Sequence, residues 1–93
     1  MKNLEELLKG KDEVWFELKR EDFLGFIQFA KKNNLKWITP KITFDMTDFR
    51  NCIEYAHLSV DKNKVVAFVP MFLWVSKTAK EFRIENAYFE TNK

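Results

Sequence analysis

The chain has 93 residues, which is enough for one folded domain and too few for two. Its 16 basic and 14 acidic residues leave a net charge of +2 at pH 7, so overall charge alone does not predict a polyanionic partner. Phe, Trp and Tyr make up 16% of the chain, whereas Gly and Pro occur only twice each. We therefore expect a single domain over residues 1–93, with an aromatic core and no flexible linker.

The N-terminal region predicts a short helix followed by a strand. Asn3 can cap a helix over about residues 4–9, which is too short to be stable without docking on something else. Apolar and polar residues then alternate over residues 13–19, which predicts a strand with Trp15 and Glu17 on its outer face. Its inner face carries Val14, Phe16 and Leu18.

The main helix is expected over about residues 21–33. Apolar residues recur there at the spacing of one helical face, and acidic residues precede them at the end that the helix dipole favours. A second short strand at residues 35–38 follows, so this part of the chain is expected to form a β-α-β unit. The expected core-facing residues of the helix are Phe23, Phe26, Ile27 and Ala30.

Strands dominate the expected C-terminal half. Alternation predicts a strand over residues 52–60, and the polar residues 61–64 predict a hairpin turn into a second strand at 65–69. Residues 71–75 are expected as a strand or a covered loop, and residues 81–90 as the last strand.

Together these elements predict an α+β fold in two layers. The sheet is mostly antiparallel, the main helix (about 21–33) packs on one of its faces, and the short N-terminal helix (about 4–9) completes the domain. One helix cannot cover both faces of a sheet this rich in aromatic residues, so a further apolar surface is expected.

No pattern in the chain predicts catalysis, a metal site or a cofactor. Cys52 and His57 are the only thiol and the only imidazole, and their odd spacing on a strand points them to opposite faces. A structural zinc site requires four Cys or His ligands, and the two glycines do not form a phosphate-binding loop. We therefore expect a protein that is not an enzyme, with no catalytic, metal-binding or cofactor-binding residues.

The strongest candidate for a binding surface is the apolar run at residues 71–75. A strand of consecutive apolar residues places apolar side chains on both of its faces, and Trp, Phe and Met are favoured at the centres of protein interfaces. The alternative is that the N-terminal helix covers this segment. The expected protein-binding residues are Met71, Phe72 and Trp74, with Trp15 as a further candidate.

Nucleic-acid binding is the alternative function. Lys31, Lys32, Lys36 and Lys41 surround Trp37, and basic side chains beside an exposed ring are typical of single-strand binding. The opposite interpretation is that these lysines only solubilise an aromatic domain and that Trp37 belongs to the core. Arg, which contacts phosphates and bases bidentately, is scarce, and this weakens the alternative.

The expected location is the cytoplasm. A single cysteine excludes an intramolecular disulfide and is typical of a reducing compartment. The acidic, amphipathic N-terminal region lacks the apolar centre of a signal peptide. The longest apolar run, residues 65–75, contains Pro70 and is shorter than the ~20 residues that a membrane span needs, so no membrane segment is expected.

The chain also resembles a known group of proteins. Phe23, Phe26 and Phe29 anchor the predicted helix, residues 33–37 (Asn-Asn-Leu-Lys-Trp) open the next strand, and residues 88–90 are Tyr-Phe-Glu. Over about residues 13–90 this arrangement resembles small uncharacterised proteins of phages and mobile elements of Gram-positive bacteria. The resemblance implies non-enzymatic accessory proteins that bind, and often inhibit or redirect, host machinery. We therefore expect a protein-binding accessory or inhibitor protein whose partner is a host protein or a second copy of itself, as in a homodimer.

Overall fold

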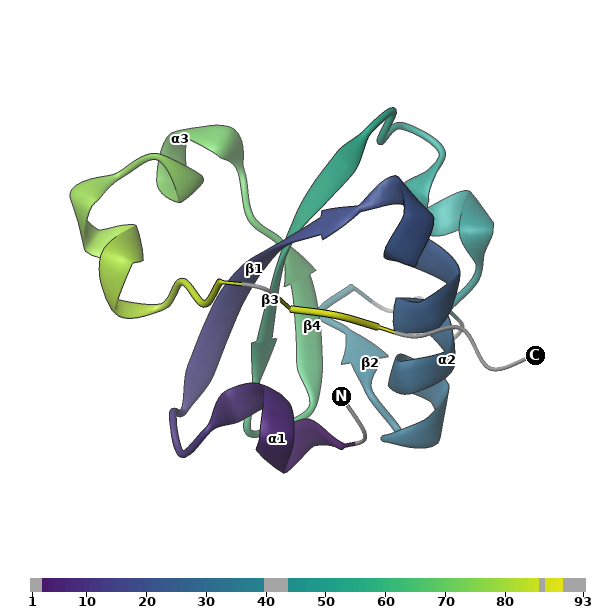
Figure 1. The fold of residues 1–93 in the computed structure, drawn as a ribbon, viewed down its shortest axis with the longest axis horizontal. Coiled ribbons are helices and arrows are strands. Elements are labelled where there is room, and N and C mark those ends of the chain that lie inside the picture. Colours follow the sequence, from purple (N-terminus) through teal and green to yellow (C-terminus); the bar gives the residue numbers. More distant parts are fainter. Residues whose placement is uncertain (1–2, 40–43, 86, 90–93) are drawn as a thin grey trace.

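A four-stranded sheet with helices on both sides forms the described part of the chain, which is residues 3–39, 44–85 and 87–89 of a computed structural model (Figure 1). The strands are β1 (Glu13–Lys19), β2 (Lys36–Trp37), β3 (Tyr55–Asp61) and β4 (Val65–Phe68). The helices are α1 (Leu4–Leu8), α2 (Phe23–Lys32) and α3 (Met71–Trp74), with the 3-10 helices η1 (Arg20–Asp22), η2 (Met46–Phe49) and η3 (Lys77–Glu81). The predicted α+β class is confirmed.

The strand order of the sheet is β1-β3-β4-β2. β3 pairs antiparallel with both β1 and β4, and β2 pairs parallel with β4. β1 and β2 therefore run in the same direction at the two edges, with the β3–β4 hairpin between them. The side chain of Asp61 accepts hydrogen bonds from the backbone N–H groups of Asn63 (2.9 Å) and Val65 (3.0 Å), which fixes the predicted hairpin turn.

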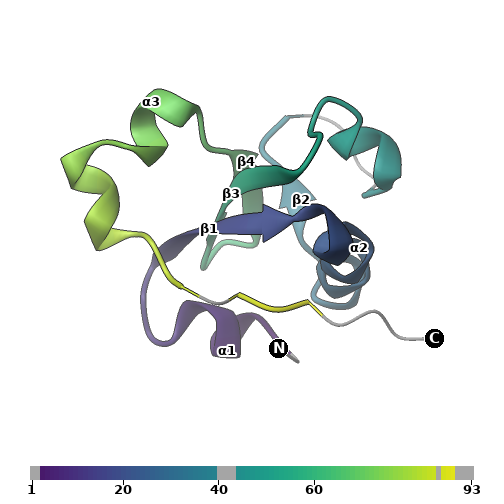
Figure 2. The ribbon, with the colours of Figure 1, turned by 45° about the horizontal axis from the view of Figure 1, so that its top comes forward.

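α2 packs its apolar side against one face of the sheet (Figures 1 and 2). The side chain of Phe26 is fully buried at the centre of this layer, and its ring centroid lies within 6.4 Å of five other phenylalanine rings. These rings belong to Phe16, Phe29, Phe44, Phe49 and Phe89. The core therefore joins β1, α2, η2 and the C-terminal segment, and the core-facing residues predicted for the main helix and the first strand are all buried.

α1 is capped by Asn3, is bonded to the end of α2 through its first residue, and packs its leucines into the core. The side chain of Asn3 accepts a hydrogen bond from the N–H of Glu6 (2.9 Å), and the N–H of Leu4 donates to Oδ1 of Asn33 (3.1 Å) just after α2. Leu7 is fully buried in the same aliphatic and aromatic cluster as α2. Docking of this kind is what allows so short a helix to persist.

The strand or covered loop expected at residues 71–75 is wrong, because the segment begins with the helical turn α3 and most of its side chains are exposed. The N–H groups of Leu73 and Trp74 both donate to the carbonyl of Pro70, at 3.0 and 2.9 Å. Pro70 cannot donate a ladder hydrogen bond, and it ends the pairing of β4. A continuous apolar run carries no period, so it is compatible with a helical turn as well as with a strand.

The strand expected at residues 81–90 is also wrong for the described positions. η3 continues to Glu81, and the pairing with β1 is a single parallel bridge between Arg83 and Trp15. Beyond this bridge the chain leaves the sheet edge and buries Ala87 and Phe89 in the core. Burial of these side chains replaces the strand pairing that the sequence pattern predicts.

Candidate functional site

Residues 70–82, here called the lobe, project from the sheet on the side away from α2 (Figures 1 and 2). The lobe consists of α3, η3 and their connection. Its inner side lies against the face of the sheet that α2 leaves open. The ring of Trp74 lies 4.3 Å from that of His57 on β3, and Phe82 stacks on Trp15 of β1 at 4.9 Å.

The lobe covers this second face of the sheet in place of α1. His57 is only 8% exposed, and the guanidinium of Arg83 lies 4.7 Å from the Trp74 ring centroid on the lobe's inner side. Leu7 and Leu8 of α1 instead join the core cluster with α2. The alternative that the N-terminal helix covers residues 71–75 is therefore wrong.

The outer side of the lobe carries a group of exposed apolar side chains. Phe72 is 73% exposed, Val75 66%, Met71 51% and Leu73 38%. Of the predicted contact residues, Met71 and Phe72 thus face solvent, whereas Trp74 and Trp15 are half-buried between lobe and sheet. Leu73 and Val75 were not predicted, and the apolar run itself was the signal that included them.

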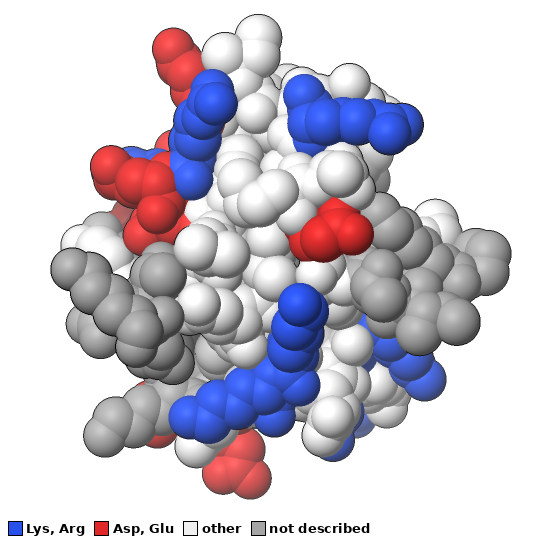
Figure 3. Space-filling view, turned by 90° about the vertical axis from the view of Figure 1, so that its right-hand side faces the viewer, with Lys and Arg blue, Asp and Glu red and all other residues white. Residues whose placement is uncertain are grey.

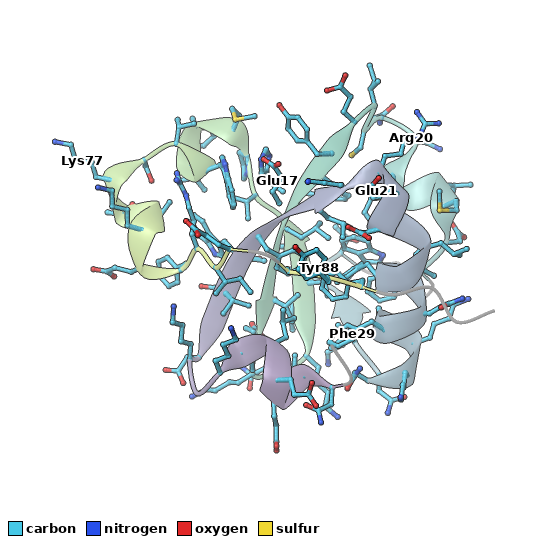
Figure 4. The ribbon with its side chains drawn as sticks, in the orientation of Figure 1. Glu17, Arg20, Glu21, Phe29, Lys77 and Tyr88 are labelled. Carbon is cyan, nitrogen blue, oxygen red and sulfur yellow. The ribbon has the colours of Figure 1, made fainter. Side chains whose placement is uncertain are left out.

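A cleft of about 640 Å³ separates the lobe from the corner where β1 enters η1. Its lining includes Glu17, Glu21 and Tyr88, and Figure 4 shows Tyr88 below the two glutamates. Glu17 also lies 3.2 Å, Oε2 to Nε2, from the buried His57. The charged residues that line the cleft are Glu17, Lys19, Glu21, Asp22, Lys80, Arg83 and Glu85. The cleft thus offers both signs of charge beside an indole ring, and no sequence pattern indicated it, because its walls come from distant segments.

Asp22, at the start of α2, is a cleft residue whose pKa the fold raises. Burial raises the pKa of Asp22 above its ordinary value of 3.8, the neighbouring carboxylate of Glu21 raises it further, and Lys19 opposes the change. The folded state therefore favours the neutral acid, and stability is lost as the pH rises through the folded-state pKa.

Replacing Asp22 by Asn is expected to stabilise the protein at pH 7, because the variant has no charge to desolvate at this position. Below pH 3.8 the wild-type side chain is neutral as well, so the difference should vanish there. Urea unfolding at pH 7 and pH 3 measures both differences. A gain that is equal at the two pH values would show that the charge of Asp22 is not its cause.

The residues considered for catalysis do not meet. Cys52 packs against the core cluster, whereas His57 contacts Trp74 on the opposite face of the sheet. Burial raises the pKa of the Cys52 thiol, which disfavours the reactive thiolate. In residues 3–39, 44–85 and 87–89, no three His, Cys, Asp or Glu side chains are grouped so that they could hold a metal ion. Within the same ranges, every helix is too short or too polar to cross a membrane.

Trp37, the ring expected beside the lysines proposed for nucleic-acid binding, is buried in the structure. Lys31, Lys32 and Lys36 are exposed near the C-terminal end of α2. Figure 3 shows basic side chains in the lower part of the face that it views. Lys41 lies outside the described residues. Trp37 is only 7% exposed, and its Nε1–H donates to Asp48 (3.2 Å). Its ring stacks between Phe44 (4.8 Å) and Phe68 (5.1 Å), so it cannot stack on a nucleobase, and the nucleic-acid hypothesis rests on the lysines alone.

The shape of the site thus combines an apolar convex surface with a charged cleft beside it. In comparisons with known proteins, no family model, no curated protein and no solved structure matches this chain.

Proposed function

We propose that the protein is a non-enzymatic binding protein that docks another protein on the outer side of the lobe. The observation that supports this most is the exposure of Met71, Phe72 and Val75 side by side on one projecting element. Burying an exposed Phe side chain contributes about 1.5–3 kcal/mol, and such residues are favoured at interface centres. Covering the lobe therefore contributes more binding free energy than covering a polar surface of the same size.

The attachment of the lobe to the sheet supports the same proposal. Trp74 packs between His57 and Arg83, and the N–H of Val69 donates to the carbonyl of His57 (2.8 Å) at the start of the lobe. A surface that is already ordered costs less conformational entropy on binding than a free loop does.

The favoured partner is a different protein rather than a second copy. A standard interface buries about 800 Å² on each side, more than four side chains on a small lobe provide if two lobes meet face to face. A groove that encloses the convex lobe reaches this area more readily. Self-association through the lobe is the outcome that would redirect the proposal to a homodimer.

We also propose a biological context for this binding. The resemblance of residues 13–90 to small proteins of phages and mobile elements supports an accessory or inhibitor role against host machinery. Cys52, the only cysteine, has no partner for an intramolecular disulfide, which supports a cytoplasmic location. The raised pKa of the Cys52 thiol supports a role other than nucleophilic catalysis.

Replacing Phe72 by Ser is expected to weaken binding of the partner at least about tenfold, because the variant removes a ring that would be buried at the centre of the interface. Stability should stay within about 0.5 kcal/mol of wild type, since the side chain is 73% exposed. Affinity capture from host extract, followed by titration of the captured protein, measures the effect.

Ile53→Ser is the matched control, because Ile53 is 77% exposed and lies in the loop before β3, outside the lobe. The proposal requires binding that Phe72→Ser removes and Ile53→Ser retains. Equal binding by both variants would exclude the lobe as the contact surface. If the wild-type protein sediments as a dimer and Phe72→Ser sediments as a monomer, the partner of the lobe is a second copy of this chain and not a host protein.

A further inference from the structure

We propose that the free edge of β1 at Glu17 and Lys19 binds an extended peptide segment, which adds to the sheet as a strand inside the cleft. This inference is separate from docking on the lobe, because it concerns main-chain groups on another wall of the molecule. Binding by strand addition needs an unpaired edge, room for a chain beside it and side chains that select the peptide. The cleft provides all three.

The hydrogen-bond pattern of β1 identifies the free edge. Pairing with β3 uses even-numbered residues, because the N–H of Arg20 donates to Glu54 (2.8 Å) and the N–H of Lys62 donates to Asp12 (2.9 Å). Since successive residues of a strand alternate, the N–H and C=O groups of Glu17 and Lys19 point away from β3. The carbonyl of Lys19 is used by η1, whose N-cap is Lys19. For the N–H groups of Glu17 and Lys19 and the carbonyl of Glu17, no hydrogen bond to another described backbone group is found.

A later segment of the same chain already pairs with this edge of β1 at Trp15, two residues before Glu17. The N–H of Trp15 donates to the carbonyl of Phe82 (2.7 Å), and the N–H of Ile84 donates to the carbonyl of Trp15 (2.9 Å). Residues 82–84 therefore occupy the position of an added strand beside Trp15, and the cleft opens where they depart. An extended peptide placed beside Glu17 and Lys19 continues the same row of hydrogen bonds.

The concave shape of the cleft favours a peptide over a second copy of this chain. Glu17 and Lys19 line the cleft together with Trp74 and Arg83 on the lobe side and Tyr88 on the other. If two copies paired through β1, these walls of each copy would collide before the edges met. A single extended strand is narrow enough to enter.

The charges of Glu17 and Lys19 predict which charged residues the bound peptide carries. Glu17 and Lys19 are both exposed and lie two residues apart, so their side chains share one face of the strand. Opposite charges directly across a strand pair are favourable, whereas like charges are unfavourable. The expected ligand therefore carries a basic and an acidic residue two positions apart, the basic one opposite Glu17 and the acidic one opposite Lys19.

The test titrates the full chain with blocked heptapeptides of the sequences Thr-Val-Lys-Val-Glu-Val-Thr and Thr-Val-Glu-Val-Lys-Val-Thr, which fit parallel and antiparallel pairing respectively. The readout is the shift of backbone amide resonances. We expect one of the two to bind saturably at up to millimolar concentration and to shift the amides of Glu17 and Lys19. Hydrogen exchange at these two amides should slow in the complex, which needs no variant.

Lys19→Pro is the decisive variant. The φ angle of Lys19 is −76°, which proline adopts, and its outward N–H donates to no backbone group in the described part of the chain, so the substitution removes the donor without breaking β1–β3 pairing. We expect at least about tenfold weaker peptide binding. Lys19→Ala keeps the N–H and removes only the charge, so it should lose less than about fivefold.

Three results would overturn the inference: equal binding by wild type and Lys19→Pro, no saturable binding of either peptide to wild type, or a wild-type dimer that Lys19→Pro makes monomeric. The last would assign the edge to a second copy. Phe72→Ser should bind the peptide as wild type does, so failure of the lobe proposal and failure of this one are distinguishable.

Discussion

Replacing Phe26 by Ala is expected to lower the free energy of unfolding by about 3–5 kcal/mol. The side chain is fully buried and contacts five other phenylalanine rings, so its removal leaves a cavity at the meeting point of α2, β1 and η2. Domains of this size have about 5–10 kcal/mol of stability in total. The variant should therefore be close to unfolding at 37 °C, which thermal and urea denaturation measure directly.

The control for this prediction is Leu24→Ala on the same helix. Leu24 is 46% exposed, and Ala has a higher helix propensity than Leu, so the loss should stay below about 1 kcal/mol. A loss below about 2 kcal/mol for Phe26→Ala would mean that the surrounding rings collapse into the space, contrary to the packing described above.

Replacing Trp74 by Ala is expected to detach the lobe from the sheet and to abolish docking on it. The half-buried ring is the contact between the middle of the lobe and His57, and the guanidinium of Arg83 also lies against it. A fully buried Trp contributes about 3–5 kcal/mol, so we expect a loss of about 2 kcal/mol here. Amide exchange of Trp74 and Val75, whose N–H groups bond within the lobe, should accelerate.

Trp74→Phe is the control, because it keeps an aromatic ring against His57, so that the lobe stays attached to the sheet. It also leaves the exposed side chains of Met71 and Phe72 unchanged. It should retain most of the partner binding, whereas Trp74→Ala should lose it. If Trp74→Ala bound the partner normally while amide exchange in the lobe rose, an ordered lobe would not be required for docking.

The body of the fold was predictable because its signals are local and periodic. Phe23, Phe26 and Ile27 repeat at helical spacing, and Val14, Phe16 and Leu18 alternate, so α2 and β1 follow from burial of one side. The lobe was not predictable in this way. Its apolar run has no period, and the turn that starts it depends on two hydrogen bonds to the carbonyl of Pro70.

The candidate site was predictable only in part. Met71 and Phe72 were expected to be exposed because apolar residues exceeded what one helix covers, and they are. Trp74 was expected beside them and Trp15 as a separate candidate, but the contacts that bury half of each ring come from His57 and Phe82, which are distant in sequence. The free edge of β1 depends on where residues 82–84 leave the sheet, and no sequence pattern encodes that departure.

The contact between Phe16 and Phe89, whose ring centroids lie 5.3 Å apart, has a consequence for biosynthesis. The two rings are among the earliest and latest described residues to be translated, and β1 likewise waits for β3 before it can pair. During translation, β1 therefore has no strand partner until β3 has left the ribosomal tunnel, and the packing around Phe16 is completed only when Phe89 follows. Folding of this domain consequently depends on contacts between residues that are far apart in the sequence. Slow translation prolongs the time during which the unfolded nascent chain can aggregate.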